Sequence, residues 1–203
     1  MKEILITILR NKTTNTAEFR RAANKTTDFL AQETFQYLRT RESKIKTYIS
    51  ETNGRILGKN IVLLPILRAG LAFLPIFLSY FENARVGFIG LKRDERTAIA
   101  RKYYQNIPEV KENDLVVILD PMIATGGTAV ETVKSLVKEG VRQNQIIFSA
   151  LLVAPEGIEF LKNEFPDIKV IFMVKDKGLN KDKFIIPGFG DFGDRYFGTE
   201  ENT

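Results

Sequence analysis

An acid and a loop of small, hydroxyl-bearing residues stand together in the stretch VVILDPMIATGGTAVETV, residues 116–133. Asp120 follows the apolar run 115–119, and two glycines lie between Thr125 and Thr128. Helical spacing of apolar residues follows this loop, and the first N–H groups of a helix have no intrahelical partner and lie in a positive potential. Glycines also let the backbone approach a ligand closely. The loop therefore predicts a phosphate-binding site. An ordinary strand-to-helix turn capped by Thr128 is the alternative.

Two arginines occupy comparable places elsewhere in the chain. Arg68 lies in PILRAGL, between a predicted buried strand and a predicted buried helix, and Arg93 follows the next predicted strand. A charge in such apolar surroundings needs a partner, which is either an acid of the fold or an anionic ligand. Position at the end of a strand favours the ligand. The case is weaker for Arg93, because Lys92, Arg96 and Arg101 crowd it.

Composition excludes several kinds of chemistry. The 203 residues include no cysteine and no histidine, so thiol nucleophiles, Ser–His–Asp triads and His/Cys zinc sites are ruled out. Any metal should be a hard cation with oxygen ligands, and Mg²⁺ carried by a phosphate is the expected one. The net charge of +5 fits anionic partners, although the basic residues are spread along the chain as on an ordinary solvated surface.

Strand and helix patterns alternate from residue 61 onward. Strands are predicted at 61–66, 86–91, 115–119, 146–153 and 170–174, and helices at 71–81, 129–139 and 157–164. This alternation predicts an α/β fold, with a mostly parallel sheet and helices on both faces. Ligands of such sheets bind beyond the carboxyl ends of the strands, which brings Arg68, Arg93 and the loop 120–128 to one edge. An amphipathic helix at 16–39 and a small hairpin within 44–57, outside the main sheet, precede this region.

Two segments do not follow the alternation. Residues 93–113 form a long polar connection, which we expect to be a functional loop without regular structure. The C-terminal residues 185–203 are rich in glycine, proline and aromatic side chains, and we expect no regular element there. Their G-x-G-x-x-G at 188–193 is not a dinucleotide fingerprint, because the required strand, helix and βαβ context is missing. The apolar run 61–81 contains an arginine and two prolines, which favours strand, loop and helix over a membrane span.

The stretch VVILDPMIATGGTA resembles the phosphoribosyl pyrophosphate (PRPP) loop of uracil phosphoribosyltransferases, and IIPGFGDFGDRYFGT resembles their C-terminal uracil-binding segment. Further matches are ILRNKTTNTAEFRRAA, PILRAGL, GLKRDERT, VAPEGI and DKGLN, so the resemblance covers nearly all of the chain. It implies a type I phosphoribosyltransferase-like domain spanning residues 1–203, with a small hood formed by the N-terminal and C-terminal segments. It also implies pyrimidine salvage, in which uracil and PRPP become UMP and pyrophosphate.

The resemblance also implies which residues act. Those expected to bind PRPP are Arg68, Arg93, Asp120, Pro121, Met122, Ile123, Ala124, Thr125, Gly126, Gly127, Thr128 and Asp191. Those expected to bind uracil are Ile185 through its carbonyl, Gly190 and Phe192 through their amides, and Asp191. Arg93, Asp120 and Asp191 are the expected catalytic residues, and Mg²⁺ is expected to arrive on PRPP without a direct protein ligand. Phe192 stands where many bacterial members have Ala, a difference that bears on the size of the uracil pocket.

By the same resemblance, N1 of uracil displaces pyrophosphate from C1′ through an oxocarbenium-like state while the connection 93–113 closes over PRPP. The expected partners are uracil and PRPP, with GTP as a possible effector, a homodimer or higher homo-oligomer as the assembly, and the cytoplasm as the location. No nucleic acid and no membrane are expected. The alternatives are a PRPP-sensing, RNA-binding regulator of the same fold and a phosphoribosyltransferase for another base.

Overall fold

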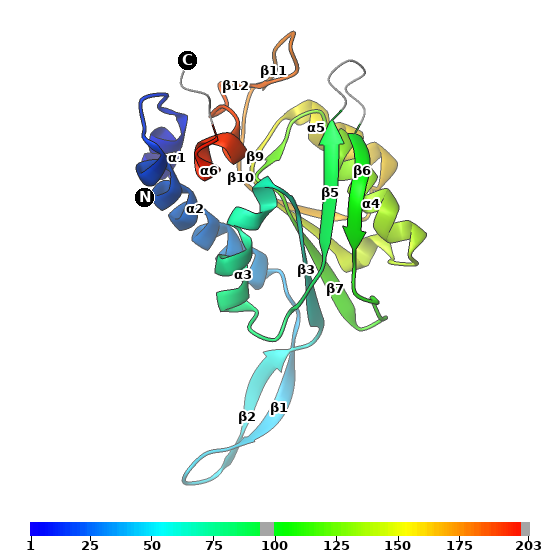
Figure 1. Ribbon diagram of the computed structural model, residues 1–203. Coiled ribbons are helices and arrows are strands. Elements are labelled where there is room, and N and C mark those ends of the chain that lie inside the picture. The colour runs from blue at the N-terminus through cyan, green and yellow to red at the C-terminus, as the bar shows by residue number, and fades with distance from the viewer. Residues whose placement is uncertain (94–99, 200–203) are drawn as a thin grey trace.

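A largely parallel sheet forms the centre of the computed structural model, which describes residues 1–93 and 100–199, without the side chains of residues 93, 100 and 101 (Figure 1). Its main path runs β10-β9-β7-β3-β5-β6, with β4 beside β3 and β8 beside β9. The bounds are β3 Asn60–Leu67, β4 Arg85–Val86, β5 Phe88–Arg93, β6 Ala100–Asn106, β7 Asp114–Leu119, β8 Met122–Ile123, β9 Ile146–Val153 and β10 Lys169–Lys175. Only β6 is antiparallel to its neighbour, β5, among these pairings. The predicted α/β class is confirmed.

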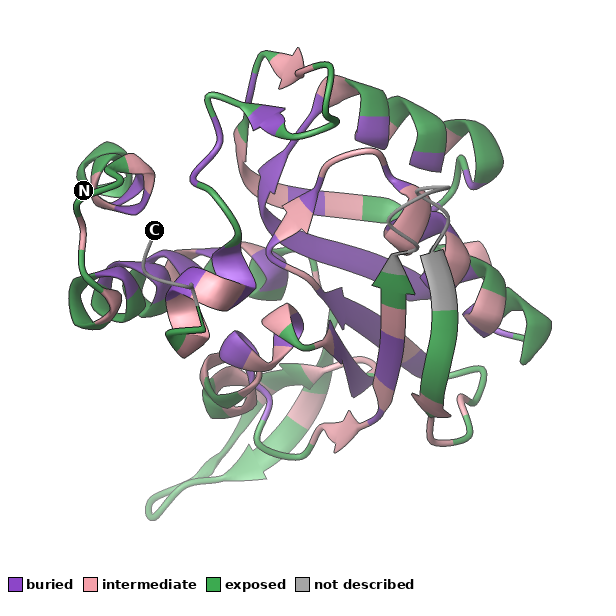
Figure 2. Ribbon diagram, turned by 45° about the horizontal axis from the view of Figure 1, so that its top comes forward, coloured by how far each residue is buried: buried purple, intermediate pink, exposed green. Residues whose placement is uncertain are grey.

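Helices cover both faces of the sheet, as predicted (Figure 1). On one face lie α1 (Lys2–Arg10), α2 (Thr16–Gln36) and α3 (Leu74–Tyr80), and on the other lie α4 (Gly127–Lys138) and α5 (Pro155–Glu164). Successive residues of β7 serve the two faces in turn: Val117 packs on the α2 side, whereas Val116 and Ile118 pack on the α4 side. Burial on both faces explains why the central strands are continuous apolar runs (Figure 2).

Most predicted elements occur within a few residues of their expected bounds. The long helix begins after Asn15, whose side chain accepts a hydrogen bond from the Glu18 N–H at 3.0 Å. It ends at Gln36 rather than at residue 39. The predicted helix 71–81 is divided into a short 3-10 turn, η1 (Ala69–Ala72), and α3.

The predicted hairpin lies outside the main sheet. Its strands, β1 (Thr40–Lys46) and β2 (Glu51–Leu57), pair only with each other among the described strands and form an arm that projects from the body (Figure 1). Tyr48 and Ile49 at its tip are fully exposed. The arm leaves the molecule at the end opposite α6, so it does not approach the carboxyl edge of the sheet.

Three elements correct the predictions. The connection 93–113 is not an irregular loop throughout, because β6 extends the sheet by pairing with β5; residues 94–99 lie outside the described part. The C-terminal segment does contain regular elements, namely β12 (Ile185–Ile186), which pairs with β11 (Gly178–Leu179), and the helix α6 (Phe192–Phe197). The helix α1 was not expected. No helix in the described ranges is long and apolar enough to cross a membrane.

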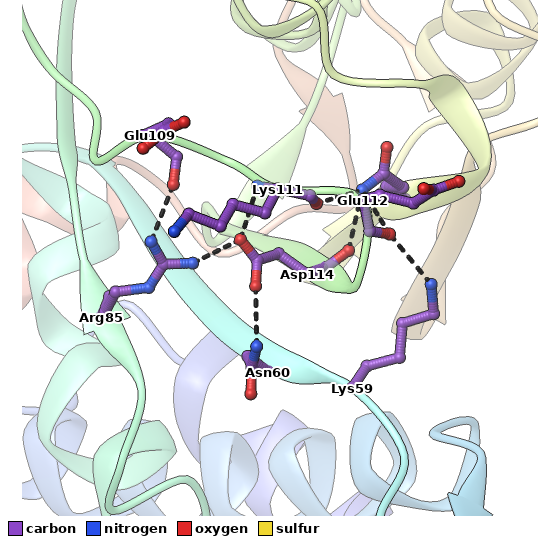
Figure 3. Close-up of polar contacts among 8 residues, drawn as sticks. Lys59, Asn60, Arg85, Glu109, Lys111, Glu112 and Asp114 are labelled. Atoms are coloured by element: carbon purple, nitrogen blue, oxygen red, sulfur yellow. Dashed lines mark hydrogen bonds and ion pairs between the residues drawn. The ribbon is translucent and has the colours of Figure 1, made fainter.

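A buried carboxylate closes the amino edge of the sheet (Figure 3). Asp114 begins β7, and its side chain is fully buried. It accepts hydrogen bonds from the Lys111 N–H at 2.6 Å, from Asn60 Nδ2 at 3.1 Å and from Arg85 Nη2 at 2.5 Å. Burial alone would raise the pKa of Asp114, but the hydrogen bonds and the arginine charge outweigh it and lower the pKa. This network joins β3, β4 and β7 at the edge away from the predicted site.

Candidate active site

The loop after β7 begins with Asp120, which is half-buried at the carboxyl edge of the sheet. The next residue, Pro121, is attached to the neighbouring strand: its carbonyl accepts hydrogen bonds from the N–H groups of Leu151 and Leu152, each at 3.0 Å. The short strand β8 then runs parallel to the end of β9. The loop that presents Asp120 is therefore attached to β9 through its backbone.

Gly126 makes the turn into α4. Its φ of +82° is in the left-handed region that favours glycine, and a Cβ at this position would lie 2.6 Å from the Gly157 carbonyl oxygen. Gly126 is also the N-cap of the helix and provides no side-chain cap. The first N–H groups of a helix have no partner within it, so they are available to a ligand. The alternative of a turn capped by Thr128 is wrong, since Thr128 lies inside the first turn of α4. A twelve-residue helix with an uncapped start suits an anion.

Arg68 follows β3 on the adjoining strand, after a cis peptide bond between Leu67 and Arg68. Its side chain is 59% exposed, and Nη2 contacts Asp194 Oδ1 at 2.9 Å. Two residues later, a Cβ added to Gly70 would lie 2.2 Å from the Leu119 carbonyl oxygen. Only glycine lets the loop after β3 lie directly against the end of β7, and this contact brings the arginine loop beside the acid loop.

The C-terminal segment lies over the same edge and forms a hood with α1 and α2 (Figure 1). Gly188 and Gly190 have φ values of +61° and +77°, so the chain turns sharply between β12 and α6. Asp191 is the N-cap of α6, because its Oδ1 accepts a hydrogen bond from the Asp194 N–H at 2.9 Å. Gly193 then packs 3.7 Å from the Ala69 side chain, measured to an added Cβ. The helix thus places Asp191 next to the loop that carries Arg68.

The Phe192 side chain lies in the core, not at a surface where it could limit the size of the predicted uracil pocket. Its side chain is fully buried, with ring centroids 5.4 Å from Phe19, 5.9 Å from Phe73, 5.9 Å from Phe189 and 5.6 Å from Tyr196. The ring is therefore part of the hydrophobic core. Only the backbone of this residue is left to face a ligand, and the change from Ala fills the core rather than the pocket.

The electrostatics single out Asp120. Burial raises the pKa of its carboxyl from the ordinary 3.8, the Met122 N–H opposes this shift by a hydrogen bond, and the negative charge of Asp191 adds to it; the pKa is about 7. Asp191 thus lies close enough to Asp120 to contribute to the raised pKa of its carboxyl, although the two predicted catalytic acids are 71 positions apart in the sequence. A carboxyl that titrates near neutral pH is typical of a functional site.

Arg93 and Ile185 are two further residues of the predicted site. Arg93 ends β5 at the same edge of the sheet, but its side chain lies outside the described part, so its role stays a prediction. Ile185 is buried in β12, and its carbonyl oxygen lies 2.4 Å from a Cβ added to Gly188. Within residues 1–93 and 100–199, no cluster of three or more acidic, histidine or cysteine side chains offers a metal site.

Sequence reasoning missed the residues that hold the hood in place. Asp176 follows β10 and is buried, and it contacts Arg10 of α1. Arg195 of α6 is 7% exposed and donates to the carbonyl oxygens of Phe189 and Asn11 at 2.7 and 2.8 Å. Asp176 could have been found, because it occupies the same place after a strand as Asp120. Nothing local in the sequence marks either arginine as buried or paired.

The mostly parallel sheet thus carries a glycine–threonine loop at its carboxyl edge, with a hood above that loop. A sequence model described as uracil phosphoribosyltransferase matches residues 2–199. The chain therefore belongs to the uracil phosphoribosyltransferase family, and the resemblance predicted from its motifs is confirmed.

Individual relatives agree with this assignment. The uracil phosphoribosyltransferase of Mycoplasma mobile is 39% identical, covering 98% of this chain and 95% of the relative. That of Dictyoglomus turgidum is 40% identical, covering 96% and 94%. Among solved structures, the AQ2163 protein from Aquifex aeolicus is similar with a TM-score of 0.89 and 33% identity, covering 98% of this chain and 95% of that one. Neither the RNA-binding regulator nor another base specificity is favoured by these matches.

Proposed function

We propose that this protein transfers the phosphoribosyl group of PRPP to N1 of uracil, forming UMP and pyrophosphate. The observation that carries the proposal is the meeting of three loops at one edge of the sheet: the turn into α4, the Arg68 loop and the segment 185–192. They offer, respectively, backbone amides for a phosphate, a cation for a second anionic group, and backbone donors and acceptors for a planar base. PRPP and uracil need these three kinds of contact.

PRPP is proposed to bind along the loop 120–128 and across to the arginines. The N–H groups at the start of α4 and the hydroxyls of Thr125 and Thr128 would hold the 5′-phosphate, since both the helix dipole and the free donors favour an anion. The ionised Asp120 carboxylate would accept hydrogen bonds from the ribose hydroxyls. Arg68 and Arg93 would neutralise the pyrophosphate, for which the planar guanidinium is well suited.

Uracil is proposed to be recognised by backbone groups. Its edge presents an acceptor, a donor and an acceptor, which match the Gly190 amide, the Ile185 carbonyl and the Phe192 amide. Backbone recognition explains how a chain without histidine or cysteine can select a base. The Phe192 ring lies in the core, so the space beside C5 of uracil would not be limited by it.

Catalysis is proposed to rest on position and charge. The C1′–oxygen bond to pyrophosphate breaks as the N1–C1′ bond forms; the leaving oxygen keeps the bonding electron pair, and the N1 proton of uracil passes to water. Arg68 and Arg93 stabilise the charge that develops on the leaving group, and Asp120 and Asp191 face the positive charge that develops on the ribose. Mg²⁺ bound to PRPP would neutralise part of the pyrophosphate charge. Because Pro121 follows Asp120, this loop would offer the ion a single carboxylate, and the pyrophosphate oxygens would carry most of its coordination.

The direct test is to incubate the protein with PRPP, Mg²⁺ and one base at a time, and to separate the nucleotide products. UMP from uracil, with little product from cytosine, hypoxanthine or guanine, is the expected result. A folded protein that forms another nucleotide would make it a phosphoribosyltransferase of different specificity. A folded protein that forms none, but binds RNA in a salt-dependent manner, would support the regulator instead.

The assembly, effector and location are also proposals. The projecting arm carries Tyr48 and Ile49 fully exposed at its tip, and exposed apolar side chains at such a place suit contact with a second copy of the chain. Sedimentation of the purified protein tests this homodimer or higher oligomer. GTP activation is tested by adding GTP to the UMP assay. Because PRPP and uracil are intracellular metabolites, we place the activity in the cytoplasm.

A further inference from the structure

One buried acid joins the N-terminal helix to the turn that would read the base. Asp176 follows β10, and 3% of its side chain is exposed. Its Oδ1 accepts a hydrogen bond from Arg10 Nη2 at 2.5 Å. Its Oδ2 accepts one from Arg10 Nη1 at 3.3 Å and one from the Gly188 N–H at 2.8 Å. A single carboxylate therefore connects the last residue of α1 to the turn between Ile185 and Gly190.

The geometry of this turn depends on Gly188. With a φ of +61° and a Cβ that would lie 2.4 Å from the Ile185 carbonyl oxygen, Gly188 permits a close approach that no other residue allows. The same freedom makes a glycine-rich turn flexible unless something restrains it. Asp176 is a firm restraint, because its own N–H donates to the Val153 carbonyl at 2.9 Å and so attaches it to the central sheet.

Arg195 holds the next part of the segment against the same end of α1. Its guanidinium lies 4.3 Å from the ring centroid of Phe19 and donates to the carbonyl oxygens of Phe189, Asn11 and Leu9. Phe189 stands between Gly188 and Gly190 in the turn. The turn between Ile185 and Gly190 is therefore held from both sides by groups that also contact the N-terminal helix.

We propose that Arg10 and Asp176 are positioning residues for uracil. They keep the Ile185 carbonyl and the Gly190 amide at the separation that the edge of the base requires. Backbone groups cannot adjust by changing rotamer, so recognition by them needs a turn that is already in place. This inference rests on the proposed function. It adds that α1, far from the base-reading segment in sequence, belongs to the uracil site rather than to the scaffold alone.

The test compares two substitutions in the same helix. Arg10→Met removes the fork that contacts Asp176, whereas Lys2→Met removes a different ion pair of α1, with Glu33 of α2. At saturating PRPP, we expect Arg10→Met to raise the KM for uracil about tenfold to hundredfold, as the loss of a charge-assisted restraint implies. The KM for PRPP and kcat should stay within about threefold, because saturating uracil restores the turn. Lys2→Met should leave both KM values unchanged.

Two further variants protect the test against a folding defect. Arg10→Lys keeps the charge but loses the fork, and should give an intermediate KM for uracil. Asp176→Asn keeps the shape but loses the negative charge and one of the two acceptor oxygens, so it cannot hold both prongs of the Arg10 guanidinium and should resemble Arg10→Met. Thermal unfolding identifies any variant that is only unstable.

The outcomes separate the two proposals. A wild-type protein that makes UMP, together with an Arg10→Met variant whose KM for uracil is unchanged, would overturn the positioning role and leave the proposed function intact. A lower melting temperature with unchanged KM would do the same, since it would make the pair purely structural. Equal increases in both KM values would also contradict it, because the effect would not be specific to the base. A folded wild-type protein that makes no UMP from uracil would remove the proposed function and the positioning role together.

Discussion

Asp120→Asn is expected to stabilise the protein at neutral and alkaline pH while it abolishes most of the activity. Burial raises the pKa of Asp120 from 3.8 to about 7, so the folded protein favours the protonated carboxyl more than the unfolded chain does. A difference of roughly three pKa units corresponds to a cost of about 4 kcal/mol when the group is ionised. This is an upper figure, because Asp120 is half-buried rather than fully buried.

The sign of the effect gives a pH dependence. Below pH 3.8 the carboxyl is protonated in both states and carries no penalty; between pH 3.8 and 7 the penalty grows, and above pH 7 it is complete. Asparagine resembles the protonated carboxyl and does not titrate. The advantage of Asp120→Asn in unfolding free energy should therefore grow by at most about 2.5 kcal/mol between pH 5 and pH 8, which is at most roughly 5–10 °C in melting temperature.

Thermal unfolding of both proteins from pH 5 to pH 8.5 measures this advantage. Asp182→Asn, at an exposed acid between β11 and β12, is the matched control and should not stabilise the protein as Asp120→Asn does, because it removes no buried charge. The kcat/KM for PRPP of Asp120→Asn should fall at least about 100-fold, because a neutral amide replaces the charged acceptor for the ribose hydroxyls. A stability difference that is the same at every pH, or an asparagine variant less stable than wild type at pH 8, would refute the reasoning.

Three other substitutions test separate parts of the structure. Gly126→Ala should lower kcat/KM for PRPP at least about tenfold, because the φ of +82° and the Gly157 carbonyl oxygen oppose a Cβ at this position. An unchanged kcat/KM would contradict the proposal that this turn binds PRPP. Asp114→Ala should cost about 3–5 kcal/mol of unfolding free energy at pH 7, and less as the pH falls through the lowered pKa of Asp114 (Figure 3). The control Glu112→Ala should change the unfolding free energy by no more than about 0.5 kcal/mol, because the Glu112 side chain is 85% exposed. Equal effects of the two substitutions in denaturant titrations would disprove this contrast. Phe192→Ala should lower the unfolding free energy by about 3–5 kcal/mol, because it empties a fully buried site. The inhibition constants of 5-substituted uracils should stay unchanged in competition assays. A new tolerance for bulky 5-substituents would instead place the Phe192 ring in the uracil pocket.

The sheet was predictable because its central strands are buried on both faces. After their first residue β3 and β7 are unbroken apolar runs, and β9 is interrupted only by Ser149; such runs are visible without knowledge of their neighbours. The rule that ligands collect at the carboxyl ends of parallel strands then placed the loop 120–128 and Arg68 at one edge. The contact between Gly70 and the Leu119 carbonyl oxygen supports that placement, and the spacing of residues in the sequence could not have predicted it.

The elements that escaped prediction depend on distant partners. β6 is a polar, partly exposed edge strand, and it acquires its structure by pairing with β5. α6 has only six residues, and its formation depends on the Asp191 cap and on the burial of Phe192 among rings from other elements. The Arg10–Asp176 pair joins residues 166 positions apart. Local propensity carries no information about contacts of this range.

The contact of Arg195 with the end of α1 also constrains the order of events during synthesis. Arg195 donates to the Asn11 carbonyl 184 positions earlier, so α1 has as its partner a residue that is translated long after it. The apolar side of α1, with Leu5, Ile6 and Leu9, is therefore completely enclosed only after α6 has been translated. Contacts of this range form slowly, because a long loop must close before they can be made. A chain that still lacks α6 can therefore complete the turn into α4 before it completes the proposed uracil-binding segment.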